Sequence, residues 1–203
     1  MYIDEGVNDP HIFKAIFMVG GPGAGKTTIA KKLIGGTGLK NVNVDTLYEM
    51  LMNKEEKDLG RFDPHTHDRA SNLHQKRRGN FISGRLGMVL DGTGRHYDVI
   101  EEIKFELESL GYDTAMVFVN TDAETAFKRI NNRERKVDKH FHDRTHMKLM
   151  QNLGKFQNLF GSDFFIVDNS DPSKTNIQYL SKHVNKFLSK PLSDTAKQWI
   201  TGK

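Results

Sequence analysis

The chain has 203 residues, of which 36% are hydrophobic and 28% charged, and it contains no cysteine. This length and apolar content are enough for one good core, so we expect a single domain. The lack of cysteine excludes disulfides, a thiol nucleophile and cysteine-ligated zinc. No apolar run approaches the length of a membrane span and residues 1–5 lack the features of a signal peptide, so we expect a cytoplasmic protein. The formal net charge of +4 suits an anionic substrate.

A glycine-rich run follows the first predicted strand, residues 14–19, and leads into an amphipathic helix over residues 27–34. Residues 20–27 read GGPGAGKT, which fits the phosphate-binding pattern G-x-x-x-x-G-K-[ST] at every position. The pattern predicts that backbone N–H groups cradle the phosphates of ATP, with Lys26 acting on the β/γ oxygens and the Thr27 hydroxyl binding Mg²⁺. The predicted ATP-binding residues are Gly21, Pro22, Gly23, Ala24, Gly25, Lys26, Thr27 and Thr28.

The second predicted strand, residues 41–44, ends directly before Asp45. A carboxylate at the end of a strand beside the γ-phosphate can accept the proton of an attacking hydroxyl. Asp45 is therefore a candidate catalytic base and acceptor-binding residue. The alternative interpretation is that Asp45 caps a helix that begins at Thr46 and ends near residue 52.

The third predicted strand, residues 88–90, comes after a polar connection and a helix over residues 68–78, and it ends at Asp91. Ligands of open α/β sheets collect at such strand ends, and an acid there can hold Mg²⁺ directly or through water. Asp91 is therefore predicted to bind the metal together with Thr27. A structural aspartate that caps the next turn is the alternative.

Strands that alternate with helices through short links predict a parallel sheet with helices on both faces. The expected fold class is α/β, a P-loop kinase-type three-layer sandwich whose five-stranded sheet has the order 2-3-1-4-5. Residues 1–12 form an extension, and Trp199 is expected to pack against the body from a weakly patterned tail, residues 190–203. The remaining predicted elements are helix 97–110, strand 114–119, a helix from an Asp122 cap to about residue 132, helix 144–159, strand 163–167 and helix 172–188.

A charged stretch without apolar periodicity follows the helix capped by Asp122, and residues 133–143 are a candidate lid. Guanidinium groups that arrive when a lid closes would stabilise the charge on the transferred phosphoryl group. Arg129 and Arg133, four residues apart on one helical face, are the predicted catalytic arginines, and Arg135 is predicted to bind the acceptor. The alternative is a solvated charged face.

Two polar residues, Asp168 and Asn169, come just after the last predicted strand. Their place at the same edge of the sheet predicts that they lie near the adenine of ATP. A polar turn without ligand contact is the alternative.

A five-residue pattern occurs twice, as His65-Thr66-His67-Asp68-Arg69 and as His140-Phe141-His142-Asp143-Arg144. Four imidazoles and two carboxylates could form a metal site, although nothing in the sequence brings the two copies together. The favoured interpretation is that Asp68 and Asp143 each cap a following helix while the histidines face solvent or substrate phosphate.

The run MVLDGTGR at residues 88–95, with the helix that follows and LGYD at residues 110–113, resembles the zeta-toxin group of P-loop kinases. With the glycine-rich run and Asp45, the resemblance extends over residues 13–168. It implies a kinase that phosphorylates a sugar hydroxyl of a UDP-N-acetyl amino sugar with ATP, with Asp45 as base and Arg129 or Arg133 on the phosphates. Arg95, in the same run, is predicted to bind the acceptor. Zeta toxins usually carry glutamate at the position of Asp91.

Residues 41–48 and 129–133 are equally similar to the kinase domain of phage-type polynucleotide kinases. The sequence thus predicts an ATP- and Mg²⁺-dependent phosphotransferase that acts on a hydroxyl or phosphate of a small anionic acceptor, such as a nucleotide or nucleotide sugar. One alternative is a polynucleotide 5′-hydroxyl kinase, for which Lys76, Arg77, Arg78 and Arg85 could grip a backbone. The other alternative is a switch protein that binds or hydrolyses ATP without transferring phosphate to an acceptor.

Overall fold

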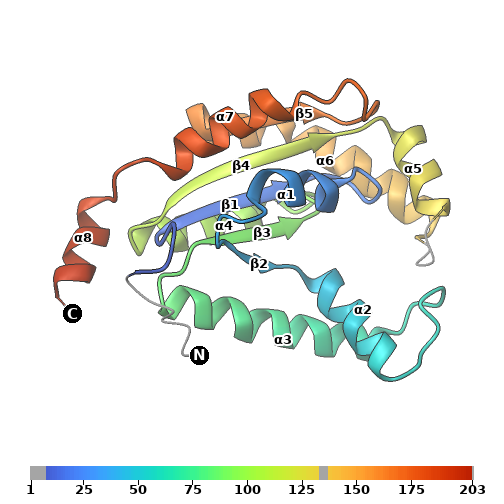
Figure 1. Ribbon diagram of the computed structural model, residues 1–203. Helices are drawn as coiled ribbons and strands as arrows, with labels where there is room; N and C mark the ends of the chain where they lie inside the picture. Colours follow the sequence, from blue (N-terminus) through green and yellow to red (C-terminus); the bar gives the residue numbers. More distant parts are fainter. Residues whose placement is uncertain (1–7, 133–136, 203) are drawn as a thin grey trace.

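A five-stranded parallel sheet organises the computed structural model, which describes residues 8–132 and 137–202 (Figure 1). The strand order is β2-β3-β1-β4-β5, as predicted. The inner strands β1 and β4 are largely apolar and buried, which suits a sheet whose two faces are both covered. The strands are β1 (Lys14–Val19), β2 (Lys40–Val42), β3 (Met88–Gly92), β4 (Asp113–Asn120) and β5 (Phe164–Asp168).

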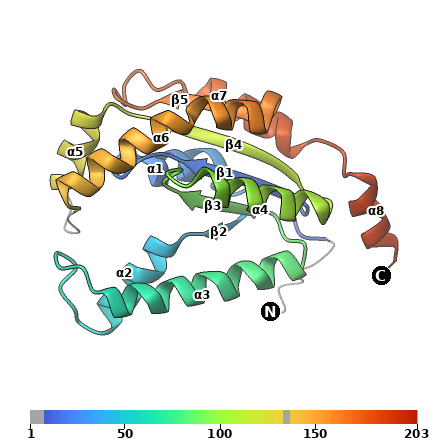
Figure 2. The ribbon, with the colours of Figure 1, turned by 180° about the vertical axis from the view of Figure 1, so that it is seen from behind.

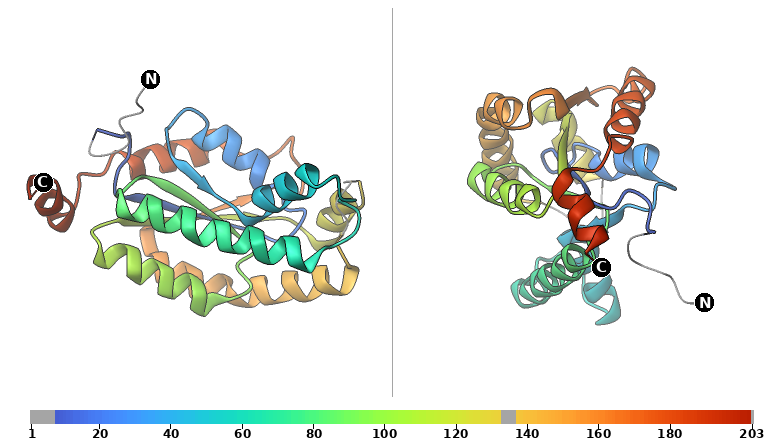
Figure 3. Two further views of the ribbon diagram at one scale, coloured as in Figure 1. Left: turned by 90° about the horizontal axis from the view of Figure 1, so that it is seen from below. Right: turned by 90° about the vertical axis from the view of Figure 1, so that its left-hand side faces the viewer.

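Helices cover the two faces of this sheet (Figures 2 and 3). On one face, α1 (Lys26–Ile34) and α7 (Ile177–Leu188) enclose a core that includes Ile29 and Phe187. On the other face, α4 (Tyr97–Ser109) and α6 (Lys139–Phe160) enclose a core that includes Leu107 and Phe156. The central strand β1 is buried along its whole length between these layers. The predicted three-layer arrangement is confirmed.

A helix pair lies beside the edge strand β2 and extends to the end of the molecule where the parallel strands finish (Figure 1). It consists of α2 (Val44–Lys54) and α3 (Pro64–Ser83), which pack through a small apolar cluster that includes Leu51, Met52 and Ala70. The loop between the two helices and helix α5 (Ala123–Asn131) are both at that end. This end of the molecule is thus framed by elements far apart in the sequence.

Several helices begin earlier than predicted because their caps are residues other than those expected. Asn43, Asp63 and Asp138 are the N-caps of α2, α3 and α6, and each side chain accepts a hydrogen bond from the third backbone N–H that follows. The first turns of α3 and α6 are polar, so the apolar periodicity that marks a helix in the sequence starts only later. The prediction of Asp122 as the cap of α5 is confirmed.

The helix predicted over residues 172–188 starts later than expected, and the tail contains a helix that was not predicted. Helix α7 begins at Ile177 rather than near Pro172, because the Asp171 carboxylate accepts a hydrogen bond from the Ser173 N–H and closes a turn there. The tail contains a further helix, α8 (Asp194–Thr201). Its Trp199 packs edge-on against Phe13, with ring centroids 5.6 Å apart, which confirms the predicted packing. Within the part of the chain that the structure describes, no helix is long and apolar enough to cross a bilayer.

Candidate functional site

The glycine-rich loop, residues 20–27, runs from the end of β1 into α1 and needs glycine at two positions. Gly23 and Gly25 have φ values of 78° and 88°, in the left-handed region that glycine adopts without cost. A Cβ at Gly23 would lie 2.1 Å from the Ala126 carbonyl oxygen, and one at Gly25 would lie 2.3 Å from the Asn169 amide nitrogen. The loop therefore takes this shape because these two positions carry no side chain.

Two neighbouring connections hold the loop at the carbonyl of Ala24. The Thr121 hydroxyl donates to that oxygen at 3.1 Å, and the Asn169 amide nitrogen donates to it at 2.7 Å. Asn169 is buried, whereas Asp168 is exposed and its carboxylate accepts from the Ser170 N–H at 2.8 Å. Asp168 and Asn169, for which the sequence predicted one shared role, thus have different environments. Asn169 holds the glycine-rich loop, and Asp168 stabilises the turn after β5.

The ammonium group of Lys26 lies between the loop and Asp91. Its Nζ donates to the carbonyl oxygens of Gly20 at 2.8 Å and Gly21 at 3.3 Å, and it is 3.9 Å from Asp91 Oδ1. These two contacts use N–H groups of the Lys26 ammonium that could donate to a phosphate oxygen instead. The phosphate-binding role of Lys26 stays a prediction.

Asp91, at the end of β3, is the most enclosed carboxylate of the site, with a side chain that is 13% exposed. Its Oδ2 accepts a hydrogen bond of 2.6 Å from the Asn43 amide. Burial raises the pKa of the Asp91 carboxyl above its ordinary value, the Lys26 ammonium lowers it, and the Asp45 carboxylate raises it again. Asp91 does not cap the next helix, because the N-cap of α4 is His96.

Asp45 lies in the first turn of α2 and is exposed. The interpretation of Asp45 as the cap of a helix that begins at Thr46 is wrong, because Asn43 accepts the capping hydrogen bond from the Thr46 N–H at 3.1 Å. Asp45 is close enough to Asp91 for its charge to affect the pKa of that carboxyl. The ends of β1, β2 and β3 therefore bring Lys26, Asp45 and Asp91 together.

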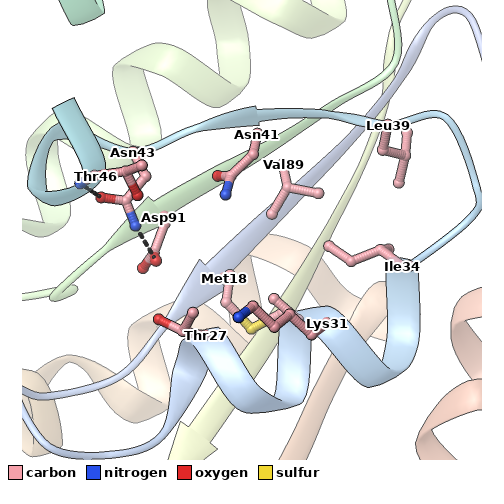
Figure 4. Close-up of a pocket in the computed structure, with 12 residues that line it drawn as sticks. Met18, Thr27, Lys31, Ile34, Leu39, Asn41, Asn43, Thr46, Val89 and Asp91 are labelled. Carbon is pink, nitrogen blue, oxygen red and sulfur yellow. Dashed lines mark hydrogen bonds between the residues drawn. The ribbon is translucent and has the colours of Figure 1, made fainter. Parts of the chain in front are cut away.

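Two cavities flank α1. One, of about 310 Å³, lies toward β5, and its lining includes Gly25, Thr28, Arg129, Asn169 and Thr175. The other, of about 200 Å³, lies toward β2 and includes Thr27, Lys31, Asn43, Thr46 and Asp91. Figure 4 shows the Thr27 hydroxyl and the Asp91 carboxylate at one end of this second cavity. Helix α1 thus separates a region beside the turn after β5 from a region beside the two carboxylates.

The predicted arginines are spread over different places. Arg129 lines the cavity toward β5, where its Nη2 donates to the carbonyl oxygens of Asn169 at 2.7 Å and Ser170 at 3.3 Å. Arg95 lies over the Phe141 ring of α6, 5.2 Å from its centroid, and its Nε donates to the His96 imidazole at 2.7 Å. Arg133 and Arg135 lie outside the described residues. Residues 139–143 of the candidate lid are the first turn of α6.

Comparison with known families supplies the decisive observation. A family model described as zeta toxin matches residues 7–179. The chain belongs to the zeta toxin family. The search of curated proteins found no match for this family member.

Solved structures similar to this zeta toxin family member share its fold at low sequence identity. The structure of AvrRxo1-ORF1:-ORF2 with ATP has a TM-score of 0.63 at 17% identity over 76% of this chain and 54% of that one. The PezAT toxin–antitoxin system of the human pathogen Streptococcus pneumoniae gives 0.59 at 19% over 91% and 90%. The Pnkp1/Rnl/Hen1 RNA repair complex gives 0.57 at 19% over 74% and 48%. The chain therefore has the P-loop kinase fold that the sequence predicted.

The repeated histidine pattern is divided between two helices of this zeta toxin family member. Asp63 and Asp138 cap those helices, so the prediction that Asp68 and Asp143 are the caps is wrong. His142 is buried against Phe127, with ring centroids 5.5 Å apart. In residues 8–132 and 137–202, no group of three histidine, aspartate or glutamate side chains is placed to hold a metal ion. The repeat is therefore a feature of two helix starts.

Sequence reasoning missed Asn43, which caps α2 and also binds Asp91. Its place directly after a strand and before a helix marks it as a cap candidate, but its bond to Asp91 spans 48 positions in the chain. Only the pairing of β2 with β3 brings the two residues together.

Proposed function

We propose that this protein is an ATP-dependent kinase that moves the γ-phosphate of ATP to a hydroxyl or phosphate of a small anionic acceptor, such as a nucleotide or nucleotide sugar. The observation that carries the proposal is the convergence of Lys26, Asp45 and Asp91 at the mouth of the glycine-rich loop. A cation for the phosphates, an acid for the metal and an exposed carboxylate for the acceptor are the parts that phosphoryl transfer requires.

The donor set suits Mg²⁺, which prefers hard oxygen ligands and keeps several waters. The Thr27 hydroxyl and the free face of the Asp91 carboxylate would hold it, since Asn43 occupies only Oδ2 of Asp91. When bound, Mg²⁺ neutralises charge on the phosphate oxygens. The backbone N–H groups of residues 21–28 would bind the phosphates, and the 310 Å³ cavity beside Asn169 would take the adenine.

Asp45 would accept the proton of the attacking hydroxyl, because it is exposed and close to Asp91. Arg133 and Arg135 keep their proposed roles on the transferred phosphoryl group and the acceptor, and Arg95 is retained as a further acceptor-binding residue. We reassign Arg129 from the transferred phosphoryl group to binding of the nucleotide. Its Nη1 is buried without a hydrogen-bond partner among the described residues, on the Gly25 flank of α1, where a ligand oxygen could accept from it.

Replacing Arg129 with alanine should therefore raise the KM for ATP about 10- to 100-fold and change kcat much less, as expected when a charged hydrogen bond to the nucleotide is lost. Steady-state kinetics with varied ATP measure both constants. Lys128→Ala is the matched control, because Lys128 is exposed one position earlier on α5 and pairs with Glu124. A lower kcat with an unchanged KM for ATP would contradict this role and show that Arg129 acts on the transferred phosphoryl group.

An exposed aromatic ring, Phe62, lies in the loop between α2 and α3. Phe62 is 59% exposed, and its ring stacks on the buried Tyr48 at a centroid distance of 6.0 Å and contacts His67 at 5.4 Å. Tyr48 is one helical turn after Asp45 on α2, so the ring that Phe62 stacks on belongs to the helix that carries the proposed base. A planar ring in the acceptor could stack on Phe62 while its hydroxyl reaches Asp45.

The loop that carries Phe62 is held by an ionic network rather than left loose. Lys57 donates to Asp63 at 2.5 Å and to Thr66 at 2.9 Å, and the Glu55 carboxylate pairs with both Lys57 and Arg69. The hydrogen bond from Lys57 lowers the pKa of the Asp63 carboxyl to about 2. A surface fixed in this way binds a ring with little further ordering cost.

Phe62→Ala should weaken binding of UMP by about 5- to 100-fold, the range expected for one stacked base, and leave binding of ribose 5-phosphate unchanged. Titration calorimetry with the two probes measures the difference. Phe105→Ala is the control, because Phe105 is equally exposed at 56% but lies on α4, on another side of the molecule. Equal affinities of wild type for both probes, or equal losses in the two variants, would contradict a ring-binding role for Phe62.

A polynucleotide 5′-hydroxyl end is the second candidate acceptor. Lys76 and Arg77 are exposed on α3, which leads away from Phe62, and the Arg77 guanidinium lies 5.5 Å from the centroid of the Phe81 ring. These exposed cations could contact the phosphates of a nucleic-acid backbone.

ADP release measured with and without acceptors tests the proposed function. The proposal predicts that ADP release in Mg²⁺·ATP is slow alone and rises when a pool of nucleotides, nucleotide sugars and 5′-hydroxyl oligonucleotides is added. Turnover that is the same with and without the pool would favour an ATP-hydrolysing switch instead.

A further inference from the structure

One side chain, Asn43, joins the helix that carries the proposed base to the acid proposed for the metal. The last paired residues of β2 and β3 are Val42 and Leu90. Asn43 follows Val42 in the chain, and Asp91 follows Leu90. Strand β2 ends there and α2 begins, so the backbone hydrogen bonds between β2 and β3 do not continue. Instead, the Asn43 amide nitrogen donates to Asp91 Oδ2 at 2.6 Å while its carbonyl oxygen accepts from the Thr46 N–H at 3.1 Å (Figure 4).

We propose that Asn43 is a positioning residue for phosphoryl transfer, which fixes the orientation of the Asp91 carboxylate and, through the start of α2, the place of Asp45 beside it. The proposal rests on the proposed function. Both polar atoms of the Asn43 side chain are used, one on each partner, so neither Asp91 nor the first turn of α2 can shift without breaking a hydrogen bond. With Oδ2 held by Asn43, the other oxygen, Oδ1, is the one nearer Lys26.

The chemistry of the position explains why an amide suits it. Serine, aspartate and asparagine cap helices about equally well, so α2 alone does not require asparagine. Serine is too short to keep the bond to Asp91, and aspartate lacks the donor and would set a third carboxylate against Asp45 and Asp91. Asparagine caps the helix, donates to the carboxylate and adds no charge.

The experiment compares Asn43→Ser and Asn43→Asp with Asn176→Ser, which makes the same cap substitution at the start of α7. Asn176 caps α7 through the Tyr179 N–H, and it is not among the residues that line either cavity. If Asn43 were only a cap, all three variants would behave alike. Titration calorimetry with the ATP analogue AMP-PNP, with and without Mg²⁺, gives a readout that does not depend on turnover.

We expect the gain in AMP-PNP affinity on adding Mg²⁺ to fall about 10- to 100-fold in Asn43→Ser and at least as far in Asn43→Asp, the range seen when partners of metal ligands are removed. Thermal melts should match Asn176→Ser, which keeps the wild-type gain. In active preparations, kcat should fall while the KM for ATP measured at saturating Mg²⁺ changes little.

If both Asn43 variants showed the same Mg²⁺-dependent gain in AMP-PNP affinity as wild type, the proposal would be overturned and Asn43 would be only a helix cap. The proposal would also be overturned if the AMP-PNP affinity of wild type did not respond to Mg²⁺. Failure of the proposed function has a different signature. In that case wild type transfers no phosphate to any acceptor, yet the Mg²⁺-dependent gain still separates the Asn43 variants from Asn176→Ser.

Discussion

Lys26→Ala should reduce phosphotransfer on the order of 10³-fold and weaken ATP binding, while the thermal melting temperature stays close to that of wild type. The reason is the position of Nζ, which donates to two loop carbonyls and lies 3.9 Å from Asp91, away from the apolar core. ATP titration and a thermal melt measure the two effects separately.

The matched control is Lys182→Ala, because Lys182 is an exposed lysine on α7 outside both cavities. It removes one positive charge from the same molecule and should change neither nucleotide affinity nor turnover. Wild-type ATP affinity in Lys26→Ala would contradict the assignment of residues 20–27 to the phosphates.

Asp45→Asn should retain nucleotide binding and slow transfer about 10²- to 10⁴-fold, the usual scale for loss of a positioned general base. The amide keeps the shape of the side chain and removes its basicity. Since Asn43 is the cap of α2, the substitution should also leave stability nearly unchanged. Rapid-quench or steady-state measurement of kcat, together with a melt, tests both statements.

Glu49→Gln is the control for this experiment, because Glu49 is an exposed acid one turn further along the same helix. A near-normal kcat in Asp45→Asn would exclude Asp45 as the base. An equal loss in both variants would show that the charge of α2 as a whole, and not one carboxylate, affects the rate.

The sheet could be predicted because its signal is local. The inner strands β1 and β4 are apolar runs buried on both faces, and the glycine-rich loop marks the end of β1, so the order 2-3-1-4-5 followed from the family of folds that carry such a loop. Helix starts were less predictable. The first turns of α3 and α6 are polar, and their caps Asp63 and Asp138 are several residues before the apolar pattern begins.

The motif residues of the proposed site could be named from the sequence, but their contacts could not. Lys26 and Asp91 could be proposed because phosphate and metal binding require a lysine in the glycine-rich loop and an acid at a strand end. Asn43 could not, since its bond to Asp91 depends on the register between β2 and β3. Arg129 was assigned to catalysis from its spacing to Arg133, but its contacts with the Asn169 and Ser170 carbonyls depend on the turn after β5.

The most direct test of the central proposal follows the fate of the terminal phosphate. Wild type, Lys26→Ala and Asp45→Asn are incubated with Mg²⁺ and γ-labelled ATP in the presence of nucleotides, nucleotide sugars and 5′-hydroxyl oligonucleotides, and the products are separated. We predict label on one acceptor class with wild type, a trace with Asp45→Asn and none with Lys26→Ala. Label that appears only as inorganic phosphate, or transfer that Lys26→Ala supports as well as wild type, would contradict the account.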